Sequence, residues 1–388
     1  MKHVGDITKL KGADLPLVDC VTGGSPCQDL STAGKRTGLI GTRSGLFMEQ
    51  IRIIKELRHA SNLSQGNNIK PRYMVWENVM GAFSSNEGRD FATVLEETIK
   101  IVQNNPPALS VPKNGWTKSG CLYDELGRWS IAWRVHDSQF WGVPQRRKRI
   151  ALVADFGGLS APEILFVRKG LSWSPSKSGE TESEITVRIG NSSKTADSAK
   201  QLVFDARGNG DGKTVCTITG DHQSRITDYT AICVQATALG GSDKYGPPGT
   251  GTNREVSYTL DTLRPHVVAN PTIGVRRLTP LEYERLQGYP DNWTDIGDYI
   301  NSKGYVMHTS DAKRYRALGN SIALPFWFWL SRRISAQYDQ PATLGSLFDG
   351  IGGFPFCWEL CNGRGTAVWA SEVDEFCIAV TKYHFGEQ

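Results

Sequence analysis

The chain has 388 residues, of which 39% are hydrophobic and 22% charged, and its formal net charge at pH 7 is +4. This length allows two domains and a full-sized core. The mild charge permits nucleic-acid binding without demonstrating it, because only a local basic surface attracts a phosphate backbone. No apolar run approaches the ~20 residues that span a bilayer, which excludes an integral membrane protein, and the amino terminus has no signal core.

The eight cysteines are scattered through the chain, and none forms a CxxC pair. Zinc and other metal sites usually place their cysteines at short, regular spacings. We therefore predict no metal site. A reduced, cytoplasmic setting fits this pattern best.

Two short apolar runs open the chain, at residues 3–7 and 17–21, and they predict two adjacent buried strands of an α/β sheet. The loop GGSPCQDLS at 23–31 follows the second run. Its glycines allow a tight turn and Pro26 stiffens the backbone before Cys27. Two interpretations of Cys27 remain open on spacing alone, a buried free cysteine and a nucleophile held over a cleft.

Helical spacing follows at residues 46–57, and a strand is predicted at 73–76, with Glu77 at its carboxyl end. Ligands of open α/β sheets bind at that edge, although a glutamate at a strand end is often a solvated loop residue. Residues 131–135 and 149–154 predict a β-pair. Between them lies QRRKR at 145–149, whose four cations fit a solvated face or a phosphate patch.

Beyond residue 157 the composition changes to Ser, Gly, Thr and Asp, with short β-like runs between glycine turns. This change predicts a second, smaller domain at 157–275. At 276–293 a helix is predicted to begin, with Thr279 as N-cap and Glu282 completing a capping box. The apolar window 322–330 predicts a packed helix after a proline start.

The last block begins with a predicted strand at 343–348. DGIGGF leads from it into an apolar helix, and a second strand at 367–370 runs to Glu372. A strand, a glycine turn and a helix bring backbone amides close to a nucleotide-like ligand. A dinucleotide site would use a similar turn, so a nicotinamide-dependent oxidoreductase stays open at this point.

Taken together, the ordered segments resemble cytosine carbon-5 DNA methyltransferases of bacterial or phage type. These segments are GGSPCQDLS, ENV at 77–79, QRRKR, RRLTPLEYERLQGYPDNW at 276–293 and RYRALGNSIALP at 314–325. The opening motifs of the family stand at the back of this chain, as SLFDGIGGF at 346–354 and ASEVD at 370–374. The chain therefore resembles a circularly permuted member. The implied fold is α/β, a doubly wound mixed sheet of the S-adenosylmethionine-dependent methyltransferase type with a smaller β-rich target-recognition domain.

The resemblance also implies residue roles. In the family, the residue at Asp6 accepts a bond from the adenine amino group, Phe348 contacts the adenine and Glu372 binds the ribose hydroxyls. The catalytic residues would be Cys27, Glu77, Gln145, Arg147 and Arg149. Those binding S-adenosyl-L-methionine would be Asp6, Ile7, Pro26, Asn320, Ser321, Phe348, Asp349, Gly350, Ile351, Gly352, Gly353, Glu372 and Val373. We expect DNA contacts from Ser31, Arg43, Arg207, Arg225 and Arg254, although a surface role is open for each arginine of the second domain.

The predicted domain organisation follows. Residues 1–156 form the first part of the catalytic domain, 157–275 the recognition domain, 276–330 the helix that links the two, 331–341 a linker, and 342–388 the cofactor-binding part. Joining the two ends of the chain would restore the family's usual order. Permutation tends to succeed where the original termini lie close together, so we predict that Met1 and Gln388 are neighbours.

The implied activity is transfer of a methyl group from S-adenosyl-L-methionine to carbon 5 of a flipped-out cytosine in a specific duplex sequence, leaving S-adenosyl-L-homocysteine. Alternatives are the same chemistry on tRNA and an inactive DNA-binding relative. The resemblance further implies a monomer in the cytoplasm, associated with the nucleoid, with double-stranded DNA as partner. It places the chain in a restriction-modification, phage or prophage system and allows a cognate endonuclease as a second partner.

Overall fold

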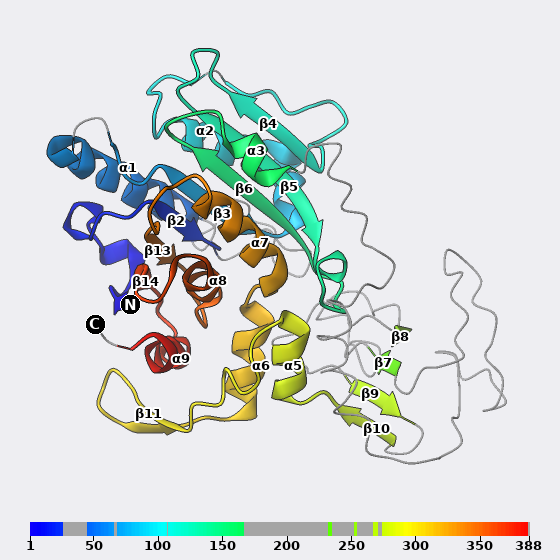
Figure 1. Cartoon of the computed structure of the whole chain (residues 1–388). Helices are drawn as coiled ribbons and strands as arrows, with labels where there is room; N and C mark the ends of the chain where they lie inside the picture. Colours follow the sequence, from blue (N-terminus) through cyan, green and yellow to red (C-terminus); the bar gives the residue numbers. More distant parts are fainter. Residues whose placement is uncertain are drawn as a thin grey trace.

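The structure of the protein is a computed structural model. It describes residues 1–25, 45–65, 68–106, 108–166 and 278–386, together with the backbone of four short strands between 232 and 277. Figure 1 shows these elements along the chain.

The centre of the molecule is an eight-stranded mixed sheet (Figure 1). Its five parallel strands are, in spatial order, β1 (Lys2–His3), β14 (Ala367–Ser371), β13 (Leu344–Leu347), β2 (Cys20–Gly23) and β3 (Tyr73–Asn78). Three antiparallel strands complete it, β6 (Lys148–Asp155), β5 (Ser130–Asp137) and β4 (Ser119–Tyr123). The expectation of a mixed α/β sheet is confirmed.

One expectation about this sheet is wrong. The strands β1 and β2 are not adjacent, because β14 and β13 lie between them. The two strands that separate them in the sheet, β14 and β13, thus come from the carboxyl-terminal part of the chain. Met1 lies beside the end of the last helix, since its amino group donates to the carbonyl of Phe385 at 3.4 Å. Gln388 itself lies outside the described residues.

Helices cover both faces of the sheet, as the alternation along β3 shows. Tyr73 and Val75 belong to one apolar cluster, and Met74 and Trp76 belong to the other, because successive side chains of a strand point to opposite faces. The second cluster includes buried residues of α1 (Leu46–Gln65) and α2 (Arg89–Ile99). The first includes those of α3 (Ala161–Leu165), α7 (Leu324–Ser335), α8 (Gly353–Asn362) and α9 (Glu375–Phe385).

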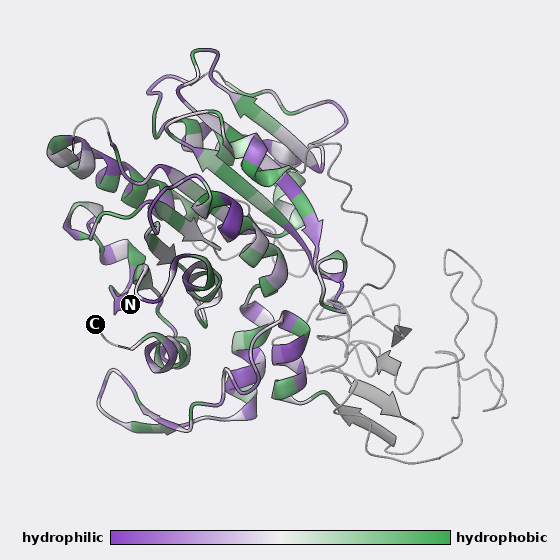
Figure 2. Ribbon diagram, in the orientation of Figure 1, coloured by the Kyte–Doolittle hydropathy of each residue, from purple (hydrophilic) through white to green (hydrophobic). Residues whose placement is uncertain are grey.

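Local signals in the sequence match these helices. In α1 the residues at helical spacing, Phe47, Ile51, Ile54 and Leu57, are all buried. Figure 2 shows hydrophobic and hydrophilic residues alternating along this helix. The helix α5 (Pro280–Gln287) begins with the predicted capping box, in which Thr279 and Glu282 satisfy each other's backbone amides.

α5 and α6 (Asp311–Asn320) pack on the face of the sheet that the first cluster covers. After α5 come the hairpin β11 (Asp298–Ile300) and β12 (Val306–His308), and then α6. Glu284 of α5 is fully buried and accepts hydrogen bonds from the amides of Asn292 and Thr294 and from Arg314 of α6. This carboxylate therefore joins α5, the following turn and α6 into one unit.

A second sheet lies within the segment predicted as the recognition domain. It is antiparallel, in the order β10 (Gly274–Arg277), β9 (Val267–Asn270), β7 (Ile232–Val234) and β8 (Thr252–Asn253). Two helices lie near the predicted domain boundaries. α3 packs in the main core, and α7 continues to Ser335, into the predicted linker.

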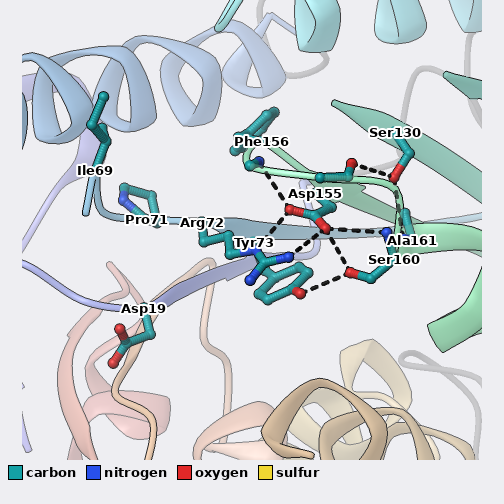
Figure 3. Close-up of polar contacts among 12 residues, drawn as sticks. Asp19, Ile69, Pro71, Arg72, Tyr73, Ser130, Asp155, Phe156, Ser160 and Ala161 are labelled. Carbon is teal, nitrogen blue, oxygen red and sulfur yellow. Dashed lines mark hydrogen bonds and ion pairs between the residues drawn. The ribbon is translucent and has the colours of Figure 1, made fainter. Parts of the chain in front are cut away.

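Asp155 anchors α3 to the sheet (Figure 3). Its fully buried carboxylate accepts two bonds from Arg72, at 2.9 and 3.0 Å, and others from Ser160 and from the amide of Gly157. The hydroxyl groups of Tyr73 and Ser160 lie 2.8 Å apart. These bonds join the start of β3 to the end of β6.

Candidate active site

The chain leaves β2 toward Cys27 beside the turn that leaves β13. Gly23 pairs with Leu347 in the register of the two parallel strands, so both segments emerge at the same edge of the sheet. A Cβ on Gly23 would stand 2.4 Å from Oε1 of Gln50, which explains why this position has no side chain. Pro26 and Cys27 lie outside the described residues, as do Ser31 and Arg43.

Glu77 lies next to this edge. A Cβ on Gly24 would stand 3.1 Å from Oε2 of Glu77 and 4.0 Å from Cε2 of Phe354 at the start of α8. Gly24 thus lies between the glutamate of β3 and the helix that follows the glycine turn. Three segments that are distant in the sequence meet at this point.

Arg149 binds Glu77 directly. Its Nε lies 3.0 Å from Oε1 of Glu77, and both side chains are largely shielded from solvent, with 14% and 12% of their surfaces exposed. Its Nη1 donates to the carbonyl of Lys148 at 2.8 Å. The arginine comes from β6, the antiparallel neighbour of β3, so strand pairing brings the two side chains together.

Arg147 of QRRKR makes other contacts. It is buried, and its Nη2 donates to the carbonyl of Gly319, near the end of α6, and to that of Ser321, which follows α6. Gln145 is fully buried, and neither polar atom of its side chain has a hydrogen-bond partner among the described residues. The structure therefore links Arg147 to the predicted cofactor segment at Asn320 and Ser321.

Two side chains to which the sequence analysis gave no role, Trp76 and Asn78, hold Ser25 just before Pro26. Trp76 Nε1 donates to Oγ of Ser25 at 3.0 Å, and Asn78 Nδ2 donates to the Ser25 carbonyl at 3.3 Å. The Asn78 Oδ1 also accepts the amide of Val79 at 2.8 Å. In the sequence, the only sign of this role is that Trp76 and Asn78 flank Glu77 of ENV and that Ser25 precedes the Cys27 loop. The contacts of Trp76 and Asn78 with Ser25 depend on the pairing of β2 with β3.

The glycine turn after β13 has a left-handed backbone at three positions, Phe348, Gly350 and Gly352, with φ values of +55°, +57° and +82°. Glu372, which follows β14, accepts the amide of Gly350 at 2.7 Å through Oε2. Its Oε1 accepts the amides of Val373 and Asp374. The acidic residue at the end of β14 thus fixes the conformation of the turn that follows β13.

Residues of the segment after α5 also contact this glycine turn. Trp293 Nε1 donates to the carbonyl of Ile351 at 2.8 Å. A Cβ on Gly353 would stand 2.5 Å from the Tyr289 hydroxyl, and that hydroxyl lies 2.5 Å from Oγ of Ser321. The segments at 289–293 and 321 therefore contact the turn that the sequence analysis assigned to the cofactor.

Asp349 within this turn is buried and accepts a 2.5 Å bond from Ser346 Oγ through Oδ1, whereas its Oδ2 has no hydrogen-bond partner in the described part of the chain. Burial raises the pKa of Asp349 to about 7, against the lowering effect of the Ser346 bond. The turn therefore contains a carboxyl group that is mostly protonated below pH 7.

Asp6 and Ile7 follow β1, next to β14. The carbonyl of Gly5 accepts a 2.7 Å bond from Ser371 Oγ, which holds this segment beside the strand that leads to Glu372. Asp6 caps a short 3-10 helix, Ile7–Lys9, because its Oδ1 accepts the amide of Thr8 at 3.0 Å. That bond lowers the pKa of Asp6. Ile7 is buried in the core.

The residues expected to hold a nucleoside ligand therefore surround one edge of the sheet. Glu372 and Asp6 stand at the ends of neighbouring strands, and the Phe348–Gly353 turn lies beside them. Oε2 of Glu372 has capacity for a further hydrogen bond, since a carboxylate oxygen accepts about two and this one accepts the Gly350 amide, whereas Oε1 already accepts two amides. These hydrogen-bond acceptors fit a ligand with hydroxyl and amino groups. The predicted DNA-binding residues Arg207, Arg225 and Arg254 lie outside the described residues, and no described helix is long and apolar enough to cross a membrane.

Comparison with known proteins identifies the family. The family described as C-5 cytosine-specific DNA methylase matches residues 1–102 and 121–336. The chain is 26% identical to the DNA N-6-adenine-methyltransferase of Escherichia phage P1, over 86% of this chain and 55% of that protein. It is 27% identical to the type II methyltransferase M1.ScrFI of Lactococcus lactis subsp. cremoris, over 83% and 63% of the two chains. It is 25% identical to M.HpaII of Haemophilus parainfluenzae, over 89% and 78%.

The chain thus spans less than two thirds of the length of the phage P1 and Lactococcus proteins. Among solved structures it is similar to the Dnmt2 methyltransferase of S. pombe, with 16% identity, a TM-score of 0.38 and coverage of 86% and 84% of the two chains. The family match extends over most of the chain, from residue 1 to the end of α7, with a gap at 103–120. The chain therefore belongs to the C-5 cytosine-specific DNA methylase family.

Proposed function

We propose that the protein transfers a methyl group from S-adenosyl-L-methionine to carbon 5 of cytosine in double-stranded DNA. The observation that carries this proposal is the Glu77–Arg149 pair beside Gly24. Ring nitrogen 3 and the carbonyl oxygen of cytosine are both bonded to carbon 2. Two side chains that bind them must therefore lie next to each other, and the 3.0 Å contact satisfies this requirement.

The proposed chemistry begins at Cys27. Carbon 5 of cytosine is a poor nucleophile, and addition of the Cys27 thiolate to carbon 6 turns it into an enamine carbon. Glu77 would donate a proton to nitrogen 3 and offset the developing charge, while Arg149 would hold the carbonyl oxygen. S-adenosyl-L-methionine, bound by the glycine turn, Glu372 and Asp6, supplies an electrophilic methyl group. Loss of the carbon-5 proton and release of the thiol would complete the cycle.

Access to carbon 6 requires that the nucleotide leave the duplex. We propose that residues 29–45, with Ser31 and Arg43, close over the DNA. We also propose that the segment 157–275 reads its sequence through Arg207, Arg225 and Arg254. The antiparallel sheet of β7 to β10 supports a separate unit there. A monomeric protein associated with the nucleoid, with a cognate restriction endonuclease as partner, completes the proposal.

A circularly permuted order is part of this proposal. β13 and β14 come last in the chain and yet separate β1 from β2. The Met1 amino group lies 3.4 Å from the Phe385 carbonyl, so a short connection between the ends would restore the order of the family. A chain in which residues 343–386 are moved to the front of Met1 should fold with unchanged methyl-donor affinity. Loss of that affinity would contradict the permutation.

The test of the activity uses the full chain, plasmid DNA and methyl-labelled donor, followed by mass spectrometry of the nucleosides. We expect 5-methylcytosine, and bisulfite sequencing should then give the target site. Cys27→Ser should abolish the product and keep DNA binding. Glu77→Gln should lower the rate strongly, while Glu87→Gln, an exposed control, should not. Product on tRNA only, N6-methyladenine, or retained turnover by Cys27→Ser would refute the proposal.

A further inference from the structure

Two aromatic side chains that follow α5 contact the glycine turn. Trp293 Nε1 donates to the carbonyl of Ile351 at 2.8 Å. The Tyr289 hydroxyl group stands so close to Gly353 that a Cβ on this glycine would lie 2.5 Å from it. Gly353 begins α8, so the hydroxyl group limits how closely this end of the helix can approach. Tyr289 and Trp293 thus fix the last residues of a turn that is distant from them in the sequence.

The Tyr289 hydroxyl group is itself held by Ser321. The hydroxyl oxygen lies 2.5 Å from Ser321 Oγ, and Tyr289 is only 4% exposed. Ser321 is fixed through its backbone, because its amide donates to the carbonyl of Leu318 at 3.1 Å and its own carbonyl accepts Arg147. Burial raises the pKa of Tyr289, so the hydroxyl group keeps its proton near neutral pH. This bond therefore connects the start of α8 to a residue that is anchored between α6 and α7.

The conformation of the glycine turn depends on contacts of this kind. Phe348, Gly350 and Gly352 all have positive φ, and Phe348 is not a glycine. A left-handed backbone at such a residue persists only where the surrounding structure holds it. Glu372 supplies one contact, since it accepts the amide of Gly350 at 2.7 Å. The segment after α5 supplies the contacts at the other end of the turn.

In the proposed function this turn binds the methyl donor. A turn that already has the binding conformation loses little conformational freedom when the donor arrives. If the turn also populated other conformations, the apparent affinity would fall in proportion to the fraction of molecules that are ready to bind.

We infer that the Tyr289 hydroxyl group, anchored by Ser321, holds the glycine turn in the conformation that binds the methyl donor. Tyr289 is therefore a positioning residue, which acts on the donor through Gly353. This inference rests on the proposed function and adds to it a side chain to which the sequence analysis gave no role. A residue that only stabilised the core would affect folding and leave the affinity of the folded protein for the donor unchanged.

The test compares two tyrosines in the full chain. Tyr289→Phe keeps the ring and removes the hydroxyl group. Tyr315→Phe is the matched control, because the Tyr315 hydroxyl group donates to the carbonyl of Leu278, before α5, at 2.6 Å. Urea unfolding measures the stability of each variant, and titration calorimetry with S-adenosyl-L-homocysteine measures its affinity. Initial rates on plasmid DNA give kcat and the KM for S-adenosyl-L-methionine.

We expect Tyr289→Phe to weaken binding of S-adenosyl-L-homocysteine about fivefold, which is the contribution of one neutral hydrogen bond. The KM for the donor should rise by a similar factor, while kcat should stay within about twofold of the wild type, because saturating donor restores the bound conformation of the turn. Tyr315→Phe should lose similar stability and keep the wild-type affinity and KM. Equal affinities of the two variants would refute the role of Tyr289 while the proposed function stands. A wild-type protein that binds neither donor nor product would refute both.

A double-mutant cycle shows whether Tyr289 acts through Ser321. Ser321→Ala removes the same hydrogen bond from the other side. The double variant Tyr289→Phe with Ser321→Ala should bind S-adenosyl-L-homocysteine no more weakly than Ser321→Ala alone, because the bond is already lost. Independent effects would multiply, and a multiplied loss of affinity in the double variant would overturn the inference.

Discussion

Replacing Asp349 by asparagine should change how the stability of the protein depends on pH. The carboxyl group is fully buried in the turn after β13, and burial raises its pKa from 3.8 to about 7. Between pH 3.8 and about pH 7 the Asp349 carboxyl group is mostly deprotonated in the unfolded chain and mostly protonated in the folded chain. The folded state then binds more protons, so the free energy of unfolding falls as pH rises through this window.

The magnitude follows from the two pKa values. At 1.36 kcal/mol for each pKa unit, the group costs the folded state about 1.7 kcal/mol near pH 5 and about 4 kcal/mol near pH 8. Asparagine has the shape of the neutral carboxyl group and does not titrate. The difference in free energy of unfolding between Asp349→Asn and the wild type should therefore grow by about 2.5 kcal/mol in favour of the variant between these pH values.

Urea unfolding followed by circular dichroism across this pH range measures the difference directly. Titration of other groups is common to both proteins and cancels in the subtraction. Asp14→Asn, at an exposed position of a short 3-10 helix, is the matched control and should show no such growth. A constant difference between Asp349→Asn and the wild type from about pH 5 to about pH 8 would show that the carboxyl group is ionised in the folded state and would refute the reasoning.

Two further substitutions test the packing of the sheet. Asp155→Ala should lower the free energy of unfolding by about 3 kcal/mol, because it removes a buried carboxylate with five hydrogen bonds. Urea unfolding measures this loss. The control Asp291→Ala, which removes an exposed ion pair, should have a much smaller effect in the same experiment. Gly345→Ala should cost about 1–3 kcal/mol, since the new Cβ would stand 2.1 Å from the ring of Trp369. Gly157→Ala, where the nearest atom is 3.5 Å away, should melt within a few degrees of the wild type, and equal melting of both glycine variants would contradict the clash.

The arrangement of the sheet explains how the two ends of the chain contribute to one site. β13 pairs with β2 and β14 pairs with β13, so the glycine turn and Glu372 reach the edge from which the Cys27 loop departs. Backbone hydrogen bonds between strands need neighbouring strands but no particular connection between them. The site can therefore be assembled from residues near both ends of the chain.

Local patterns in the sequence were sufficient for several of the individual elements. The spacing of Phe47, Ile51 and Ile54 predicted α1, and Thr279 with Glu282 predicted the start of α5. Each of these signals acts over a few residues, through helical periodicity or a capping bond, and can be read without knowledge of the rest of the fold. The position of Glu77 at the carboxyl end of a buried strand was likewise a local inference.

The tertiary structure alone decided which elements are neighbours and where each side chain points. The insertion of β14 and β13 between β1 and β2, the contact of Arg149 with Glu77, the turn of Arg147 toward Ser321, and the burial of Asp349 all depend on pairing between distant strands. Strand pairing is made by backbone groups that are the same in nearly every residue, so the sequence carries little local record of it. Burial and pKa follow only once that pairing is complete.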